Sequence, residues 1–243
     1  MEYKRILIKL SGEALMSKHK SNKVLNKEVM FNIANQIKSL TEQGIEIGIV
    51  IGGGNTFRGK YCDELSIERA PADYMGMVGT IFNSLALKAV LDSLNVENVV
   101  MSAININQVC EPYYYLKALS HLNKKRVVIF AGGTGNPYFS TDTAAALRAS
   151  EINADVILMA KNGVDGVYNK DPRQYDDAIK YDYITYDEFL SNKLEAIDLN
   201  AVNLCQSNKI NLIVFNMDEE NAIINVVKGE KIGTFLGEEK KNG

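Results

Sequence analysis

Several stretches of the sequence place glycine beside a cation or a polar side chain, as phosphate-binding sites do. Lys9 is followed by Ser11 and Gly12, and the glycine run Gly52–Gly54 is followed by Arg58. Because glycine lacks a Cβ, its backbone amides can approach an anion closely, and an ammonium or guanidinium group can neutralise that anion. The Walker A pattern GxxxxGK[ST] is absent, so a phosphate site in this chain must have another design.

The densest stretch of this kind is residues 127–172. An apolar segment, Val127–Ala131, reads as a strand that is buried on both faces. It stops at the turn Gly132–Pro137, whose glycines could leave backbone amides free to surround an anion. Thr141-Asp142-Thr143 then reads as a helix N-cap before a run of strong helix formers.

A second apolar strand is expected over 154–160, followed by Lys161 and Asn162 and then by a tight hairpin at 164–168. If the helix between the two strands is a crossover, the two strand ends lie side by side. Ligands bind at that edge of open α/β sheets. The polar residues at these strand ends are therefore candidate site residues.

Composition limits the function classes. The chain has 243 residues, of which 46% are hydrophobic, and a net charge of −3 without a dense Lys/Arg run. That is enough for one large core or two joined lobes, and it argues against nucleic acid as a partner. No segment approaches the apolar length of a membrane span, and the N-terminus lacks a signal-peptide pattern. Cys62, Cys110 and Cys205 form no CxxC pair, which favours a reducing cytoplasm over zinc or disulfide chemistry.

The order of elements predicts the fold class. Strands and helices alternate with short loops, which implies an α/β fold, a three-layer α/β/α sandwich on a mainly parallel sheet. The helix expected from Asp73 to about Leu94 is apolar on more than one face, as for a central core helix or one shared with a subunit interface. Asp73 is either its N-cap or a ribose-hydroxyl acceptor. Strands are expected at 4–9, 45–51, 96–102, 127–131, 154–160, 212–215 and 233–236, and the other helices at 26–43, 112–121, from 141, 185–191, from 198 and 219–227.

Together these sites suit a long anionic ligand with two phosphate-bearing parts. The chain offers no Ser/His/Asp or Cys/His arrangement for nucleophilic hydrolysis. Phosphoryl transfer suits these residues better. It needs backbone amides, a few cations and Mg²⁺ to stabilise and align the phosphates, and it needs little acid–base chemistry.

The motifs resemble those of the bacterial UMP kinases, which belong to the amino acid kinase superfamily. The resemblance covers almost the whole chain, and this set of motifs in this order is highly specific. They are KLSGEAL at Lys9–Leu15, IGGGNxFRG at Ile51–Gly59, DYMGM at Asp73–Met77, GTGNPYF at Gly133–Phe139, Thr141-Asp142, VDGV at Val164–Val167, and the segments Ile197–Leu199 and Val214–Met217.

The resemblance implies the reaction ATP + UMP → ADP + UDP, with Mg²⁺ accompanying ATP, in one domain over residues 1–243. Its UMP-binding part would be about 1–155 and its ATP-binding part about 156–243. The implied catalytic residues are Lys9, Arg58, Asp198 and Asp142, with Asp198 orienting Lys9 and Asp142 on the UMP side. The implied ATP-binding residues are Lys9, Leu10, Ser11, Gly12, Gly54, Arg58, Asn162, Tyr168 and Asp171. The implied UMP-binding residues are Gly53, Asp73, Thr134, Gly135, Asn136, Pro137, Tyr138, Phe139, Ser140 and Thr141, with Asp73 taking the ribose hydroxyls.

The resemblance also implies a cytoplasmic homohexamer that UTP inhibits. The family is commonly activated by GTP, but residues 16–25 lack the glycine-rich pattern of GTP-activated members. Other readings remain open at this point. They are a kinase of the same superfamily that acts on an acyl acid or carbamate, a non-catalytic nucleotide-binding protein on the same fold, and a Rossmann dehydrogenase, against which the missing GxGxxG counts.

Overall fold

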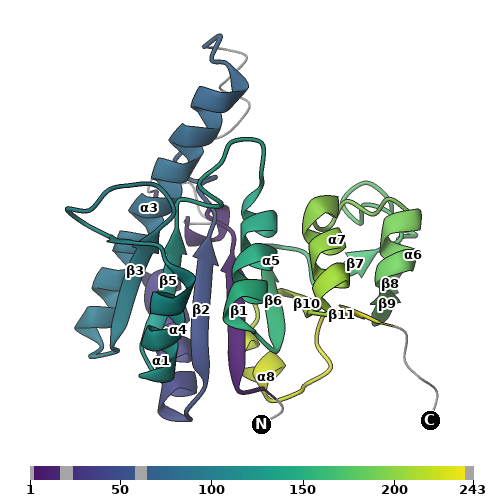
Figure 1. Cartoon of the computed structure of the whole chain (residues 1–243). Coiled ribbons are helices and arrows are strands. Elements are labelled where there is room, and N and C mark those ends of the chain that lie inside the picture. The colour runs from purple at the N-terminus through teal and green to yellow at the C-terminus, as the bar shows by residue number, and fades with distance from the viewer. Residues whose placement is uncertain (1–2, 17–23, 58–64, 239–243) are drawn as a thin grey trace.

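The computed structural model describes residues 3–16, 24–57 and 65–238, and it is built on one long sheet (Figure 1). Nine strands pair in the order β4-β3-β5-β2-β1-β6-β10-β11-β9, and every pair except β10–β11 is parallel. The strands are β1 (Arg5–Leu10), β2 (Glu46–Ile51), β3 (Asn98–Ser102), β4 (Glu111–Pro112), β5 (Val127–Ala131), β6 (Val156–Lys161), β9 (Tyr183–Thr185), β10 (Asn211–Asn216) and β11 (Thr234–Gly237). A separate antiparallel pair joins β7 (Val167–Tyr168) to β8 (Lys180–Tyr181).

Helices cover both faces of the sheet, as the alternation of side chains along the strands requires. In β1, Ile6 and Ile8 belong to the core under α1, α3 and α8, whereas Leu7 belongs to the core under α4 to α7. The predicted α/β/α sandwich is therefore confirmed. The helices are η1, a 3₁₀ turn at Glu13–Leu15, and α1 (Lys27–Glu42), α3 (Arg69–Ser93), α4 (Tyr115–Asn123), α5 (Thr141–Ile152), α6 (Tyr186–Ser191), α7 (Leu199–Asn208) and α8 (Ala222–Val227).

Two predictions of which segments lie next to one another were wrong. The ends of β5 and β6 do not lie side by side, because β2 and β1 separate these strands in the sheet. The 164–168 segment is not a tight hairpin, since Val167 and Tyr168 pair with Tyr181 and Lys180 across a long loop. Both errors concern pairing between distant segments, which local turn signals do not determine.

Three helix starts also differ from the predictions. α3 begins at Arg69 rather than at Asp73, and Pro71 lies in its first turn, where backbone N–H groups have no intrahelical partner to lose. Asp73 is therefore not a helix cap. Ser140 rather than Thr141 caps α5, and α4 begins at Tyr115 rather than at Pro112.

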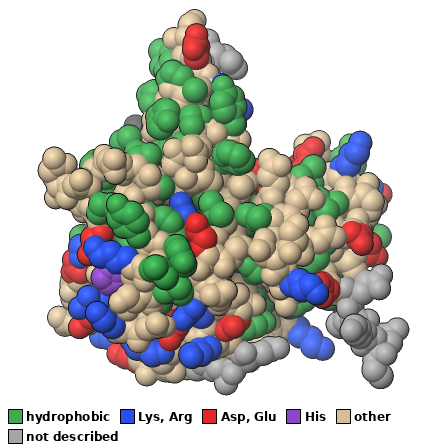
Figure 2. Space-filling model, in the orientation of Figure 1, with side chains coloured by type: hydrophobic (Ala, Val, Ile, Leu, Met, Phe, Trp, Pro, Cys, Tyr) green, Lys and Arg blue, Asp and Glu red, His purple; other side chains and the backbone are tan. Residues whose placement is uncertain are grey.

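α3 is the longest helix of the described residues, and its N-terminal half projects beyond the sheet (Figure 1). Contrary to the prediction, its length and composition alone would suit a membrane span, but nearly half of that window is buried inside the protein. The helix packs against α1, β3 and β5 as a core helix does. Hydrophobic side chains gather over its projecting part (Figure 2), and four large ones on its outer face are exposed, namely Tyr74, Met75, Val78 and Phe82.

Candidate active site

A buried ion pair lies at the carboxyl end of β1. The ammonium group of Lys9 donates to Oδ1 of Asp142 at 2.6 Å, and the side chains are 8% and 13% exposed. Lys9 is the penultimate residue of β1, and Asp142 is in the first turn of α5. The side chain of Lys9 therefore points to the face of the sheet that α5 covers, at the positive end of the α5 dipole.

A second lysine completes this cluster. Lys161, the last residue of β6, lies 3.5 Å from Oδ2 of Asp142. Burial alone would raise the pKa of Asp142, but the charges of Lys9 and Lys161, with hydrogen bonds from Lys9 and the Asp198 backbone, lower it to about 2. Burial lowers the pKa of Lys161, and the charge of Lys9 adds to this while Asp142 opposes it.

The contacts of Lys9 differ from those expected for the two aspartates. Asp142, and not Asp198, holds Lys9. Asp198 is the N-cap of α7, where its carboxylate accepts from Asn200 N at 2.8 Å and from the Thr143 hydroxyl at 3.2 Å. Asp198 thus reaches the ion pair through its backbone, which stabilises the Asp142 carboxylate.

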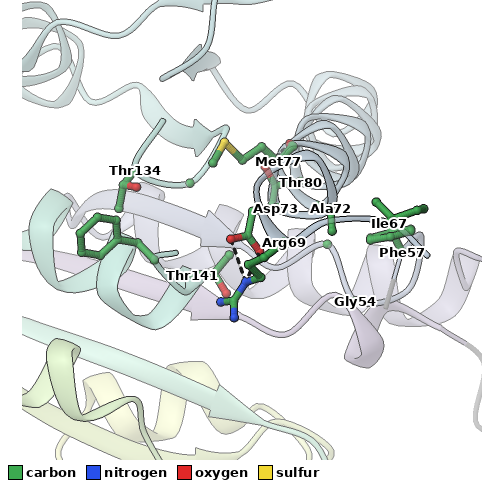
Figure 3. A pocket seen from close by; sticks show the side chains of 14 residues that line it. Gly54, Phe57, Ile67, Arg69, Ala72, Asp73, Met77, Thr80, Thr134 and Thr141 are labelled. Atoms are coloured by element: carbon green, nitrogen blue, oxygen red, sulfur yellow. Dashed lines mark hydrogen bonds and ion pairs between the residues drawn. The ribbon is translucent and has the colours of Figure 1, made fainter. Parts of the chain in front are cut away.

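A cavity of about 510 Å³, shown in Figure 3, is lined by Thr141, the neighbour of Asp142. The turn after β2, the first half of α3, the turn after β5 and the start of α5 line it. Figure 3 shows the Arg69–Asp73 pair between Phe57 and Ile67 on one side and Thr134 on the other. Among the residues expected to bind UMP, those that line it are Gly53, Asp73, Thr134, Phe139 and Thr141, and Gly54, which was expected at the phosphates, lines it as well.

Asp73 is occupied by protein groups in this structure. Its two carboxylate oxygens accept from Arg69 Nε at 3.0 and 2.9 Å, and Oδ2 also accepts from Tyr138 N at 2.7 Å. Tyr138 has a φ of +72° and lies beneath the Arg69 guanidinium, whose central carbon is 5.7 Å from the ring centroid. Sequence reasoning missed Arg69, although its spacing of four residues before Asp73 on a helix was a usable signal.

The turn after β5 does not present a ring of free amides, as its glycines had suggested. Gly132 N donates to the Thr80 hydroxyl at 2.8 Å, and Gly135 N donates to Gly132 O at 2.9 Å. Asn136 N donates to the Thr134 hydroxyl at 3.2 Å. The glycines instead allow the chain to turn here, because Gly132 and Gly135 have positive φ angles of 76° and 83°, which glycine adopts without strain.

The remaining residues of that turn lie outside the cavity lining. Ser140 caps α5 by accepting from Thr143 N at 3.1 Å, and the side chain of Tyr138 is largely exposed. Gly135, Asn136 and Pro137 do not line the cavity either. These residues shape the turn that carries Thr134 and Phe139.

A second cavity, also about 510 Å³, lies on the other side of Lys9. Lys9 and Ser11 border it, together with the loops after β6 and β7 and the segment Asn192–Ala196 after α6. The expected residues Asn162, Tyr168 and Asp171 all line it. Lys161, expected at the end of its strand, lines it as well. Lys170, Arg173 and Asn192–Ala196 also line it, although no sequence motif had pointed to them.

Two of the expected side chains in this cavity have local partners. The Tyr168 hydroxyl donates to Asp165 Oδ1 at 2.6 Å, and this hydrogen bond, with burial, raises the pKa of Tyr168 to about 12. Asp171 accepts from Arg173 N at 2.9 Å and from Gln174 Nε2 at 3.0 Å. The Tyr168 hydroxyl and the Asp171 carboxylate are thus already bonded within the protein.

The turn after β1 meets the turn after β2 at close range. A Cβ at Gly12 would lie 2.4 Å from Gly52 O, so no other residue fits there. The side chain of Leu10 is fully buried in the core, which leaves only its backbone for a ligand. Arg58 lies outside the described residues.

No group of three or more His, Cys, Asp and Glu side chains that could hold a metal ion occurs in residues 3–16, 24–57 and 65–238. Asp142, beside the Thr141 that lines the first cavity, is already paired with Lys9. This donor set fits Mg²⁺ that arrives on nucleotide phosphates and keeps several waters, which is how Mg²⁺ usually binds in kinases.

Comparison with known proteins agrees with this geometry. The amino acid kinase family model matches residues 4–216. The chain is 49% identical over 236 residues to a uridylate kinase of Limosilactobacillus reuteri, covering 97% of this chain and 98% of the relative. It matches the structure of the Bacillus anthracis UMP kinase with a TM-score of 0.93 and 42% identity, covering 98% of this chain and 97% of the other. For the Ureaplasma parvum UMP kinase the TM-score is 0.91 and the identity 40%, over 98% and 100% of the two chains. The chain therefore belongs to the amino acid kinase family and, within it, to the bacterial UMP kinases.

Proposed function

We propose that this protein transfers the γ-phosphoryl group of ATP to UMP, giving ADP and UDP, as a step in the synthesis of pyrimidine nucleotides. The observation that carries the proposal is the pair of similar cavities that the Lys9–Asp142 ion pair links at the start of α5. Thr141 lines the first cavity, its neighbour Asp142 holds Lys9, and Lys9 borders the second. A donor and an acceptor nucleotide in the two cavities would direct their phosphates at one another across this point.

In this arrangement UMP occupies the first cavity and the ATP nucleoside the second. Lys9 and Lys161 neutralise the charge that builds up on the transferring group, and Ser11 with the Gly12 backbone steadies the phosphates. Arg58 and Gly54 serve the phosphates between the nucleotides. Asp73 takes the UMP ribose hydroxyls. When bound on ATP, Mg²⁺ supplies charge neutralisation at the phosphate oxygens.

The direct test is an ADP-release assay with Mg·ATP in which UMP, CMP, dUMP, N-acetylglutamate and aspartate are each supplied separately as the acceptor. Turnover with UMP supports the proposal. Turnover with an amino acid alone would keep the fold and overturn the substrate. Tight binding of UMP without any turnover would favour a nucleotide-binding protein.

Asp73→Asn is expected to raise the KM for UMP by about tenfold, the scale for weakening a hydrogen bond to a charged group, and to leave the KM for ATP near wild type. A ribose contact exists both before and during transfer, so kcat should change less than KM. Steady-state kinetics with each substrate varied in turn measures this. Asp92→Asn, an exposed carboxylate paired with Lys88 on the same helix, is the control. A change confined to the KM for ATP would place Asp73 on the other nucleotide.

We also propose a homohexamer, UTP inhibition and a cytoplasmic location. The exposed apolar face of α3 supports assembly, because contiguous apolar surface on a helix is typical of subunit contacts. Cys110 and Cys205 are buried free thiols, which supports a reducing compartment. Light scattering of the purified protein tests the assembly, and titration with UTP and GTP tests the effectors. Much of the 16–25 segment lies outside the described residues.

We propose a single domain whose N-terminal part binds UMP and whose C-terminal part binds ATP.

A further inference from the structure

Two buried polar side chains on the inner face of α3 bond to the turns that border the first cavity. Thr80 and Asn83 are 3% and 0% exposed. With Gly76 and Gly79 they follow one another at helical spacing, so all four lie on one side of the helix. That side faces the carboxyl ends of β2 and β5.

Asn83 is bonded to the turn after β2. Its amide nitrogen donates to Gly52 O and to Asn55 Oδ1, both at 2.7 Å, and Asn55 Nδ2 is 2.9 Å from Asn83 Oδ1. Asn55 Nδ2 also donates to Val24 O at 2.9 Å. A fully buried amide with these partners fixes the path of the turn that supplies Gly53 and Gly54 to the acceptor cavity.

Thr80 is bonded to the turn after β5. Its hydroxyl accepts from Gly132 N at 2.8 Å and donates to Met77 O at 2.7 Å. The amide of Gly132 is buried, so removing the Thr80 oxygen would leave that N–H without its partner. This bond sets where Gly133 and Thr134 enter the cavity.

Glycines bring α3 and the turn after β2 into direct contact. A Cβ at Gly53 would lie 2.6 Å from Gly76 O, and one at Gly79 would lie 2.1 Å from the Thr56 hydroxyl. At Gly53 backbone therefore packs on backbone, and at Gly79 the helix packs directly on the Thr56 side chain. The helix cannot shift relative to this turn without breaking the bonds of Asn83.

We propose that Thr80 and Asn83 are positioning residues for the acceptor nucleotide. Asn83 holds the loop after β2, and Thr80, one helical turn earlier on α3, holds the loop after β5. Because both loops border the acceptor cavity, these two residues fix its width. The inference rests on the proposed function, because it assigns the acceptor to this cavity. The second cavity is lined from other elements, so we expect the main effect of these residues on the binding of the acceptor.

The test is Thr80→Val, which keeps the shape of the side chain and removes the oxygen. We expect the KM for UMP to rise about tenfold, the scale for one unpaired buried amide, while the KM for ATP stays within twofold. Thr80→Ser restores the hydroxyl and should return the KM for UMP to near wild type. Ser84→Ala is the matched control, since the Ser84 hydroxyl is also buried but donates only within the helix, to Thr80 O at 2.8 Å.

Thermal unfolding of all variants separates positioning from stability. Equal rises in both KM values for Thr80→Val, or the same KM change in Ser84→Ala, would overturn the proposal. If Thr80→Val does not fold, Asn55→Ala is the alternative variant. Asn55 is less buried than Thr80, and its replacement removes the hydrogen bonds between Asn55 and Asn83, so the KM for UMP alone should rise. If the wild type uses another acceptor, the proposed function fails, and Thr80→Val must then raise the KM for that acceptor.

Discussion

Replacing Lys9 with methionine is expected to lower kcat by about 10²–10³-fold or more, the scale for losing one preorganised group that stabilises transition-state charge. Lys9 is 8% exposed and is held by Asp142 at 2.6 Å, so its ammonium group is already in place before the substrates bind. Methionine keeps the unbranched side chain and loses only the charge and the donor. Lys161 stays beside Asp142, at 3.5 Å, and partly compensates the buried carboxylate.

Steady-state ADP release under saturating Mg·ATP and UMP measures the effect, and circular dichroism with thermal unfolding establishes that the variant is folded at the assay temperature. Lys88→Met is the control, because Lys88 is a surface lysine in an exposed pair with Asp92. Wild-type turnover in a folded Lys9→Met protein would remove Lys9 from the mechanism.

Much of the fold followed from local patterns in the sequence. The strand Val127–Ala131 was predicted to the residue, because an apolar run between a loop and a glycine turn has few alternatives. The Asn26 cap of α1 was predicted correctly, since its side chain accepts from Glu28 N at 2.9 Å. In each case the deciding interaction lies within a few residues of the chain.

Predictions failed where distant segments decide the outcome. The separation of β5 from β6 depends on β1 and β2 pairing between them, which no local pattern encodes. The turn amides were expected to be free, but Thr80, on a helix far back in the chain, already binds Gly132 N. Lys161 was expected at the end of its strand, but its pairing with Asp142 is set by the neighbouring strands and by α5, which no local pattern encodes.

The two aspartates illustrate the same limit and lead to the sharpest comparison. We expect Asp142→Asn to lower kcat by about 10²-fold or more, because Lys9 loses the carboxylate that holds it. Asp198→Asn should lower kcat by about tenfold or less, which is the lower end of the effects seen when a residue acts through another residue. Asparagine is as good a helix N-cap as aspartate, so α7 should stay capped and the comparison is not confounded by unfolding.

The charge state of the pair supports this order. The pKa of Asp142 is about 2 against an ordinary 3.8, so its ion pairing contributes stability that is present above about pH 4 and is lost as the pH falls toward about 2. At the assay pH the carboxylate is fully charged. Asp142→Asn removes that charge and leaves the Lys9 and Lys161 ammonium groups without their shared counter-ion. Burial already lowers the pKa of Lys161, and in this variant Asp142 no longer opposes that shift.

Asp155→Asn provides the matched control, because the Asp155 carboxylate accepts from the backbone N–H groups of Lys4 and Arg5, at 2.7 and 2.8 Å, at the opposite end of β1. That variant should lower the unfolding temperature without changing kcat. Kinetics on the three variants decide between the aspartates. A larger loss of kcat in Asp198→Asn than in Asp142→Asn would mean that the lysine changes partner when the nucleotides bind, and the role that the motifs first suggested for Asp198 would return.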